Sequence, residues 1–219
     1  NGDLLIASML DRQVLRFTGS EALLPYADLS TIAERRINDM LVDSQGRAWV
    51  GNFGFDLSSG EPVMPGTLAR VDSDGSVHAA ADDLLFANGM TLLSKESVLV
   101  VAETFKGCLT AFDISAESEL INRRVWAALP EGAAPDGICA DAEGAIWVAS
   151  PTTGSVLRLG EGGAVLDSID TGRQAIACAL GGPEGDTLFV SSAVATERQA
   201  CREALTARID AYRVLVPVA

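Results

Sequence analysis

Alternating hydrophobic and polar positions recur in three similar stretches of the chain. In each stretch an alternating apolar segment leads into a polar turn and continues as a second, more hydrophobic segment. The stretches are residues 38–51, 88–102 and 136–149, which begin about 50 residues apart. Alternation with a period of two predicts β-strands. Turns such as Ser44-Gln45-Gly46 suit hairpins, because glycine adopts a positive φ at low cost. Each stretch is therefore predicted to begin with a β-hairpin.

Two more strands are predicted after the hairpin in the first and last stretches. They are residues 66–71, 76–80, 154–159 and 164–169. Trp49 and Trp147 recur at one position of the repeat and are predicted to lie in the core. Four short antiparallel strands in every 40 to 50 residues or so are typical of a blade of a β-propeller. The sequence thus predicts an all-β fold of the β-propeller class.

The two ends of the sequence extend this pattern. A fourth, less regular copy begins near Ile176, and residues 207–214 are predicted to be its closing strand. Residues 3–8 and 12–17 match the second and third strands of a further blade, whose first strand is missing. About five blade-equivalents are therefore expected. We expect residues 1–219 to form a single β-propeller domain, truncated at its N-terminus.

Composition and charge narrow the range of functions. Apolar residues make up 48% and charged residues 21% of the chain, as in globular proteins. Asp and Glu number 30 against 16 Lys and Arg, which gives a net charge of -14. This charge repels phosphate backbones and anionic lipids, so neither nucleic acid nor a membrane is an expected partner, whereas a cation is favoured. No signal peptide or membrane-spanning run is visible, so a cytoplasmic location is predicted.

Histidine and cysteine limit the chemistry further. The single histidine, His78, directly follows a turn and is predicted to be a solvated strand residue, which excludes a zinc site with several histidines. The cysteines Cys108, Cys139, Cys178 and Cys201 are widely spaced and contain no C-x-x-C motif. We expect them to be reduced cysteines of the core, which again favours the cytoplasm.

Three polar residues share one position in the repeat. Asn38, Asn88 and Asp136 stand at the start of the first strand of consecutive blades, the strand that lines the central channel of a propeller. The fourth copy is expected to have Ala177 or Cys178 there, so polarity is not a consensus of the repeat. Oxygen ligands without imidazole or thiolate suit a hard cation such as calcium, magnesium or manganese. The alternative is structural, because Asn and Asp also favour turns.

A long connection separates the second and third strands of the first stretch. Phe53 to Asp56 open it, and it continues from Leu57 to Pro65. Long loops in compact folds are often functional. This segment is therefore predicted to be a lid, and we call residues 53–65 the lid loop.

The motifs resemble those of the gluconolactonase/regucalcin family, also called senescence marker protein. The resemblance rests on Arg36-Ile37-Asn38-Asp39, Phe86-Ala87-Asn88-Gly89 and Pro135-Asp136-Gly137-Ile138, and it covers nearly the whole chain. It implies a six-bladed β-propeller with one divalent cation in its channel. Members of this family act on lactones and in some branches on organophosphates. Calcium is the first cation to expect by this resemblance, with zinc, manganese and magnesium as alternatives.

The resemblance also implies roles for individual residues. Asn38, Asn88 and Asp136 match three of the four metal ligands, Asp136 also matches the general base, and Arg36 and Asn38 match substrate-binding residues. The fourth ligand, a glutamate, would precede Asn1, so these residues alone are expected to bind metal poorly and their activity in isolation is an open question. Glu61 lies near the position of a glutamate of the family's lid.

These observations predict a metal-dependent hydrolase that opens a sugar-type lactone, a small-molecule substrate. The cation would polarise the carbonyl group and Asp136 would act as general base. The alternatives are an organophosphate or ester hydrolase with the same fold, a cation-binding propeller without catalytic activity, and a propeller that binds proteins. The sequence assigns no oligomeric state.

Overall fold

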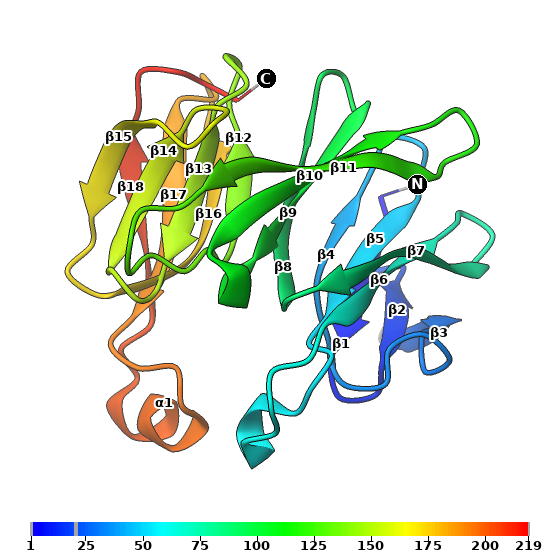
Figure 1. Cartoon of the computed structure of the whole chain (residues 1–219). Coiled ribbons are helices and arrows are strands. Elements are labelled where there is room, and N and C mark those ends of the chain that lie inside the picture. The colour runs from blue at the N-terminus through cyan, green and yellow to red at the C-terminus, as the bar shows by residue number, and fades with distance from the viewer. Residues whose placement is uncertain (1, 20–21, 219) are drawn as a thin grey trace. The chain divides into compact units, whose positions relative to one another are not determined.

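The computed structural model describes residues 2–19 and 22–218, and most of its regular secondary structure is β-strand (Figure 1). The two ends of the predicted domain, Asn1 and Ala219, lie outside the described residues. Within those residues the strands form five antiparallel sheets, and there is one α-helix, α1 (Arg198–Ala204). Short 3-10 turns are η1 (Leu57–Ser59) and η2 (Thr104–Lys106). The prediction of an all-β fold of the β-propeller class is confirmed, and each sheet is one blade.

The blades follow the order of the sequence. The first is β1 (Leu4–Ser8), β2 (Gln13–Phe17) and β3 (Leu23–Asp28), and the second is β4 (Ile37–Val42), β5 (Ala48–Asn52), β6 (Gly66–Val71) and β7 (Val77–Leu84). The third is β8 (Ala87–Leu93), β9 (Val98–Glu103), β10 (Cys108–Ile114) and β11 (Leu120–Ala128). The fourth is β12 (Ile138–Ala140), β13 (Ile146–Ser150), β14 (Ser155–Leu159) and β15 (Val165–Asp170), and the fifth is β16 (Gln174–Gly181), β17 (Thr187–Ala193) and β18 (Arg208–Arg213). The three repeats predicted from the hydrophobic pattern are therefore the three four-stranded blades.

The chain divides into two compact units. The N-terminal unit contains residues 1–88 and 115–120, and the C-terminal unit contains residues 89–114 and 121–219. The hydrophobic core of the N-terminal unit joins the first blade to the second through the fully buried side chains of Val14, Leu29, Ile37, Val50 and Val71. This core forms because successive side chains of a strand point to opposite faces of its sheet, so the apolar side chains on the facing sides of two blades pack together.

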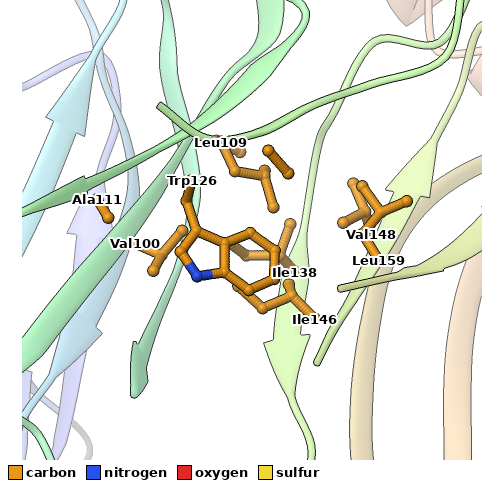
Figure 2. Packing of buried hydrophobic residues seen from close by; sticks show 10 residues of the cluster. Val100, Leu109, Ala111, Trp126, Ile138, Ile146, Val148 and Leu159 are labelled. Carbon is orange, nitrogen blue, oxygen red and sulfur yellow. The ribbon is translucent and has the colours of Figure 1, made fainter. Parts of the chain in front are cut away.

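The core of the C-terminal unit joins the third and fourth blades. Figure 2 shows the indole of Trp126 packed among Val100, Leu109, Ile138 and Ile146. A further cluster, which includes Trp147, Leu188 and Val190, joins the fourth blade to the fifth. No helix in the described residues is long and apolar enough to span a membrane.

A buried aspartate closes the first hairpin in two of the blades. Asp43 accepts hydrogen bonds from the backbone of Gln45 and Arg47, from the Arg47 guanidinium at 2.7 Å and from the Trp49 indole at 3.2 Å. Asp141 does the same for its turn and accepts 2.7 Å from Arg158. Trp49 and Trp147 are both buried, as predicted. In the second blade the bond from the Trp49 indole to Asp43 links the polar turn directly to the apolar core.

The histidine prediction is confirmed, and the cysteine prediction is wrong for one residue. His78 lies in β7 with about half of its side chain exposed, and its Nε2 is 3.2 Å from Asp72. All four cysteines are free thiols; Cys108 and Cys178 are buried and Cys139 is partly buried. Cys201 is exposed because it lies on α1, and no residue of this helix is buried.

Candidate functional site

Two of the three predicted ligands are in contact. The side-chain nitrogen Nδ2 of Asn38 donates a hydrogen bond of 2.9 Å to Oδ1 of Asn88 within the N-terminal unit. Asn88 is 5% exposed, and it lies at the start of β8, whereas Asn38 lies at the start of β4. The bond fixes the orientation of the Asn88 amide, and an amide oxygen has a second lone pair with which to bind another group.

Asp136, the third predicted ligand, belongs to the C-terminal unit. It is partly buried two residues before β12, where its backbone nitrogen donates to Ala149 at 2.9 Å. Its carbonyl oxygen accepts a 3.2 Å hydrogen bond from Gly89, the residue that follows Asn88. A Cβ atom at Gly89 would lie 2.5 Å from that oxygen, so only glycine permits this approach. The close packing of the two backbones therefore explains why glycine follows Asn88, and a preference of Asn-Gly for turns does not.

The strand register corrects the prediction for the fourth copy of the repeat. Ile138 pairs with Val148 in the fourth blade, and Cys178 pairs with Val190 in the fifth. The residue of the fifth blade that corresponds to Asp136 is therefore Ile176, not Ala177 or Cys178. A β-bulge between Ala175 and Ala177 inserts one residue there, and a sequence alignment does not show such an insertion. The corresponding residue is still apolar, so the three polar positions remain particular to their blades.

A neighbouring carboxylate was not among the predicted site residues. Asp39 follows Asn38 at a β-bulge, where the register shifts between Ile37 and Met40. It has solvent-exposed surface yet is surrounded by protein atoms on most sides, and this desolvation raises the pKa of its carboxyl group. A perturbed carboxyl group beside polar side chains is a common feature of functional sites. The repeat alignment gave no signal for it, because the other two blades have glycine at this position.

Arg36 contacts the lid loop. Its Nη2 donates a 2.8 Å hydrogen bond to Oγ of Ser58 and lies 3.7 Å from Oδ1 of Asp56. Asp56 also caps η1. It accepts hydrogen bonds from the Ser58 hydroxyl at 2.6 Å and from the Ser58 backbone nitrogen at 2.9 Å, and these bonds, with the nearby Arg36, hold the pKa of its carboxyl group below the usual value. The arginine predicted to bind substrate is thus already paired with an acid of the predicted lid.

The preceding arginine holds the other end of the lid loop. Arg35 forms two hydrogen bonds with Glu61, at 2.9 and 3.1 Å, and Glu61 accepts a further one from the backbone of Asp56 at 2.7 Å. Glu61, the residue near the position of the family's lid glutamate, therefore belongs to an ion pair. This pair borders a pocket of about 320 Å³ that is also lined by Asn52, Met64 and Thr67.

Asn52 holds the two ends of the lid loop together, and nothing in the sequence indicated this role. Its Oδ1 accepts from the backbone of Gly54 at 3.1 Å, and its Nδ2 donates to the carbonyl oxygen of Thr67. Gly54 has a φ of 73°, and a Cβ there would lie 2.4 Å from the backbone of Pro65. The two ends of the loop are therefore held together by one buried amide side chain and one obligatory glycine.

Glu103 is a further buried acid and is the last residue of β9. It is fully buried in the C-terminal unit, where it lies 3.1 Å from Lys106 and 3.3 Å from Arg123 and accepts a hydrogen bond from Thr110. These contacts compensate its charge, so its position indicates a structural ion pair.

The amide pair of Asn38 and Asn88 in the N-terminal unit offers oxygen atoms of the kind that hard cations prefer. Amide and carboxylate oxygens are the ligands that calcium and magnesium prefer, and the amide pair is already oriented by its own hydrogen bond. Across residues 2–19 and 22–218 there is no cluster of three His, Cys, Asp or Glu residues that could hold a metal ion.

Curated proteins named regucalcin and lactonase are similar to this chain. Over 171 residues it is 29% identical to regucalcin from Danio rerio, a match that spans 76% of this chain and 57% of that protein. Over 189 residues it is 29% identical to the 6-deoxy-6-sulfogluconolactonase of Pseudomonas putida, spanning 83% of this chain and 63% of that protein. The chain thus matches less than two thirds of the length of either relative.

The fold is shared with a solved structure. A calcium-binding regucalcin from Agrobacterium tumefaciens superposes with a TM-score of 0.80 and 22% identity, covering 100% of this chain and 75% of that one. The family model described as the SMP-30/gluconolactonase/LRE-like region matches residues 1–194. This match covers most of the chain, and the chain belongs to the SMP-30/gluconolactonase/LRE-like family.

Proposed function

We propose that this protein is a metal-dependent lactonase that opens a neutral, sugar-type lactone. The observation that carries the proposal is the 2.9 Å hydrogen bond between Asn38 and Asn88, in a chain of this family. It joins two amide side chains from the first strands of consecutive blades, where the repeat alone would not require polar residues. Relatives named as lactonases support the reaction class.

Asn38, Asn88 and Asp136 are the proposed ligands of one divalent cation. Calcium is the first ion to test, because the solved relative from Agrobacterium tumefaciens is described as calcium-binding. When bound, the cation supplies Lewis-acid polarisation of a carbonyl oxygen and neutralises negative charge. The hydrogen bond from Asn38 keeps Oδ1 of Asn88, the oxygen proposed to bind the cation, in position.

The residues of the chain have distinct roles in the proposed reaction. Asp136 acts as the general base and takes a proton from the attacking water molecule, so that a hydroxide equivalent adds to the lactone carbonyl carbon. The ring C–O bond then breaks, the ring oxygen is protonated, and a hydroxy acid leaves. Arg36 and Asn38 bind the hydroxyl groups of the sugar through their N–H donors. The lid loop limits the access of bulk water.

The pairing of Arg36 supports a neutral substrate. Asp56 and Ser58 already contact the guanidinium, so its positive charge is partly compensated before a substrate binds. Arg35 is compensated by Glu61 in the same way. An anionic substrate would have to compete with these acids in a strongly acidic protein, whereas a hydroxyl group needs only the remaining donors. We therefore propose an uncharged polyhydroxy lactone.

The experiment is a lactone assay on protein from which divalent cations have been removed. Glucono-δ-lactone is the first substrate, and acid release is measured after addition of calcium, manganese, zinc or magnesium. We expect hydrolysis above the spontaneous rate with at least one cation and none with the chelator alone. Hydrolysis that is unaffected by chelator would contradict the metal dependence. Cation binding without turnover on any lactone would favour a scaffold protein instead.

A further inference from the structure

Two cysteines from neighbouring blades lie next to each other in the C-terminal unit. Cys139 in β12 and Cys178 in β16 are 39 residues apart in sequence, and their sulfur atoms are 3.9 Å apart. The thiol of Cys139 points toward the sulfur of Cys178. Cys178 in turn points toward the carbonyl oxygens of Trp147 at 3.4 Å and Gly137 at 3.6 Å. Neither thiol has a role in the proposed reaction.

The backbones around the two cysteines are also very close. The backbone nitrogen of Gly137 donates a 2.9 Å hydrogen bond to Ile176, and a Cβ at Gly137 would lie only 2.7 Å from the Cα of Ala177. A disulfide needs Cα atoms within about 7 Å and sulfur atoms at about 2 Å. The two sulfur atoms, already 3.9 Å apart, have to approach by about 2 Å to form the bond.

We propose that Cys139 and Cys178 are a site of covalent modification, at which a peroxide oxidises the two thiols to an intrachain disulfide between the fourth and fifth blades. The thiolate sulfur of Cys139 attacks one oxygen of hydrogen peroxide, the O–O bond breaks, and Cys139 becomes a sulfenic acid while hydroxide leaves. The sulfur of Cys178 then attacks the sulfenic sulfur. The S–O bond breaks, the proton of Cys178 combines with the leaving hydroxide, and water departs. In total two thiols are oxidised and one peroxide is reduced to two molecules of water.

The surroundings of the two thiols set this order of events. Cys139 is partly exposed, so a small oxidant can reach it, whereas Cys178 is buried. Its contact with Cys139 and its burial hold the pKa of the Cys178 thiol well above the usual value, which disfavours the thiolate that would react with peroxide directly. Cys178 is thus suited to react second, with a neighbour that is already in contact.

The disulfide would change the surroundings of the proposed general base. It removes the S–H group of Cys178 that contacts the carbonyl oxygen of Gly137, the residue after Asp136. It also closes a loop of about 40 residues, which stabilises the folded chain relative to the unfolded one. Reduction by a dithiol reverses both changes.

Peptide mapping tests the proposal in the unmodified protein. Cleavage after Lys and Arg places the four cysteines on separate peptides, namely residues 107–123, 125–158, 174–198 and 199–202. The protein is treated with hydrogen peroxide, its remaining thiols are alkylated under denaturing conditions, and the digest is analysed without reductant. We expect the peptides 125–158 and 174–198 to be joined and to separate after dithiothreitol. The mass of the intact protein, measured before alkylation, should fall by two hydrogens on oxidation. The same mass change is expected in a Cys108→Ala, Cys201→Ala variant.

Two control variants make the result specific. Cys139→Ser and Cys178→Ala should each abolish the joined peptide, and the retained cysteine should then gain oxygen or remain alkylated. The proposal is overturned if both cysteines of the folded parent are alkylated or carry added oxygen without being joined. It is also overturned if the only disulfide formed joins Cys201 to another chain. Circular dichroism of the parent before oxidation confirms that the folded protein was tested.

Discussion

Asn38 donates a hydrogen bond of 2.9 Å from its side chain to Oδ1 of Asn88. The two residues come from the first strands of consecutive blades and are separated by about 50 residues in sequence. A hydrogen bond between two amides leaves the orientation of each side chain defined, and in this chain it defines the acceptor proposed to bind a cation.

Replacing Asn38 by alanine should weaken cation binding. The variant removes one proposed ligand and the donor that orients Asn88, and loss of an orienting contact typically lowers metal affinity by about tenfold or more. Isothermal titration with calcium measures the change. Gln45→Ala is the control, because it removes an exposed amide side chain from a turn of the same blade. Equal affinities in the two variants would contradict the role given to Asn38.

Replacing Asp56 by asparagine should shift the substrate preference toward anionic lactones. Asparagine keeps the size of the side chain but removes the charge that compensates Arg36. Because the pair is exposed, the effect should be modest, about two- to fivefold in the ratio of kcat/KM for an anionic over a neutral lactone. Asp74→Asn removes an acid from a turn of the same blade that does not contact Arg36, and it should leave the ratio unchanged. If the ratio of kcat/KM values for the anionic and the neutral lactone also stays constant in Asp56→Asn, Asp56 does not contribute to substrate specificity.

Acid should loosen the lid loop. Contacts with Arg35 and with the Asp56 backbone lower the pKa of Glu61 below its ordinary value. A lowered folded-state pKa means that this stabilisation is present above the unfolded-state pKa and is lost as the pH falls through the folded-state pKa. Hydrogen exchange of the Asp56 amide, which donates to Glu61, reports this contact directly. Its protection factor should fall between neutral pH and about pH 3. In Glu61→Gln, which does not titrate, the protection factor should stay constant over the same range.

The buried aspartate of the second blade should be important for stability. Asp43→Asn leaves the Arg47 guanidinium without its buried partner and disturbs the bond to the Trp49 indole. Removing one member of a buried ion pair costs about 3 kcal/mol or more in the free energy of unfolding. Urea unfolding measures this cost, and Asp74→Asn, at an exposed turn, should cost much less. Similar midpoints for the two variants would show that the Asp43 contacts contribute little.

Much of the fold follows from local patterns in the sequence. The hairpins at Gly46 and Gly144 and the burial of Trp49 and Trp147 depend on strand alternation and turn chemistry, which are local properties. The repeat period then aligns Asn38 with Asn88, which are indeed in contact. Regular structure of this kind is visible in the sequence because each blade repeats the same pattern of strands and turns.

Irregular parts of the chain could not be predicted in the same way. The bulge at Ile176, the residue that corresponds to Asp136 in the fifth blade, adds one residue without a marker in the sequence. The contact of Arg36 with Asp56 depends on the path of a loop that has no period. The proximity of Cys139 and Cys178 could not be inferred from the repeat either, because their spacing of 39 residues is well short of its period of about 50.

The central claim is that Asp136 acts with a bound cation to open a lactone, and the most direct test compares Asp136→Asn with Asp167→Asn. Asp167 is an exposed aspartate of the same blade, so the two variants carry the same change in charge. Initial rates of lactone hydrolysis are measured with saturating cation, after circular dichroism has shown that both variants are folded. The account predicts that Asp136→Asn loses at least about a hundredfold in kcat while Asp167→Asn keeps the parent rate. Parent-like turnover in folded Asp136→Asn would contradict the claim.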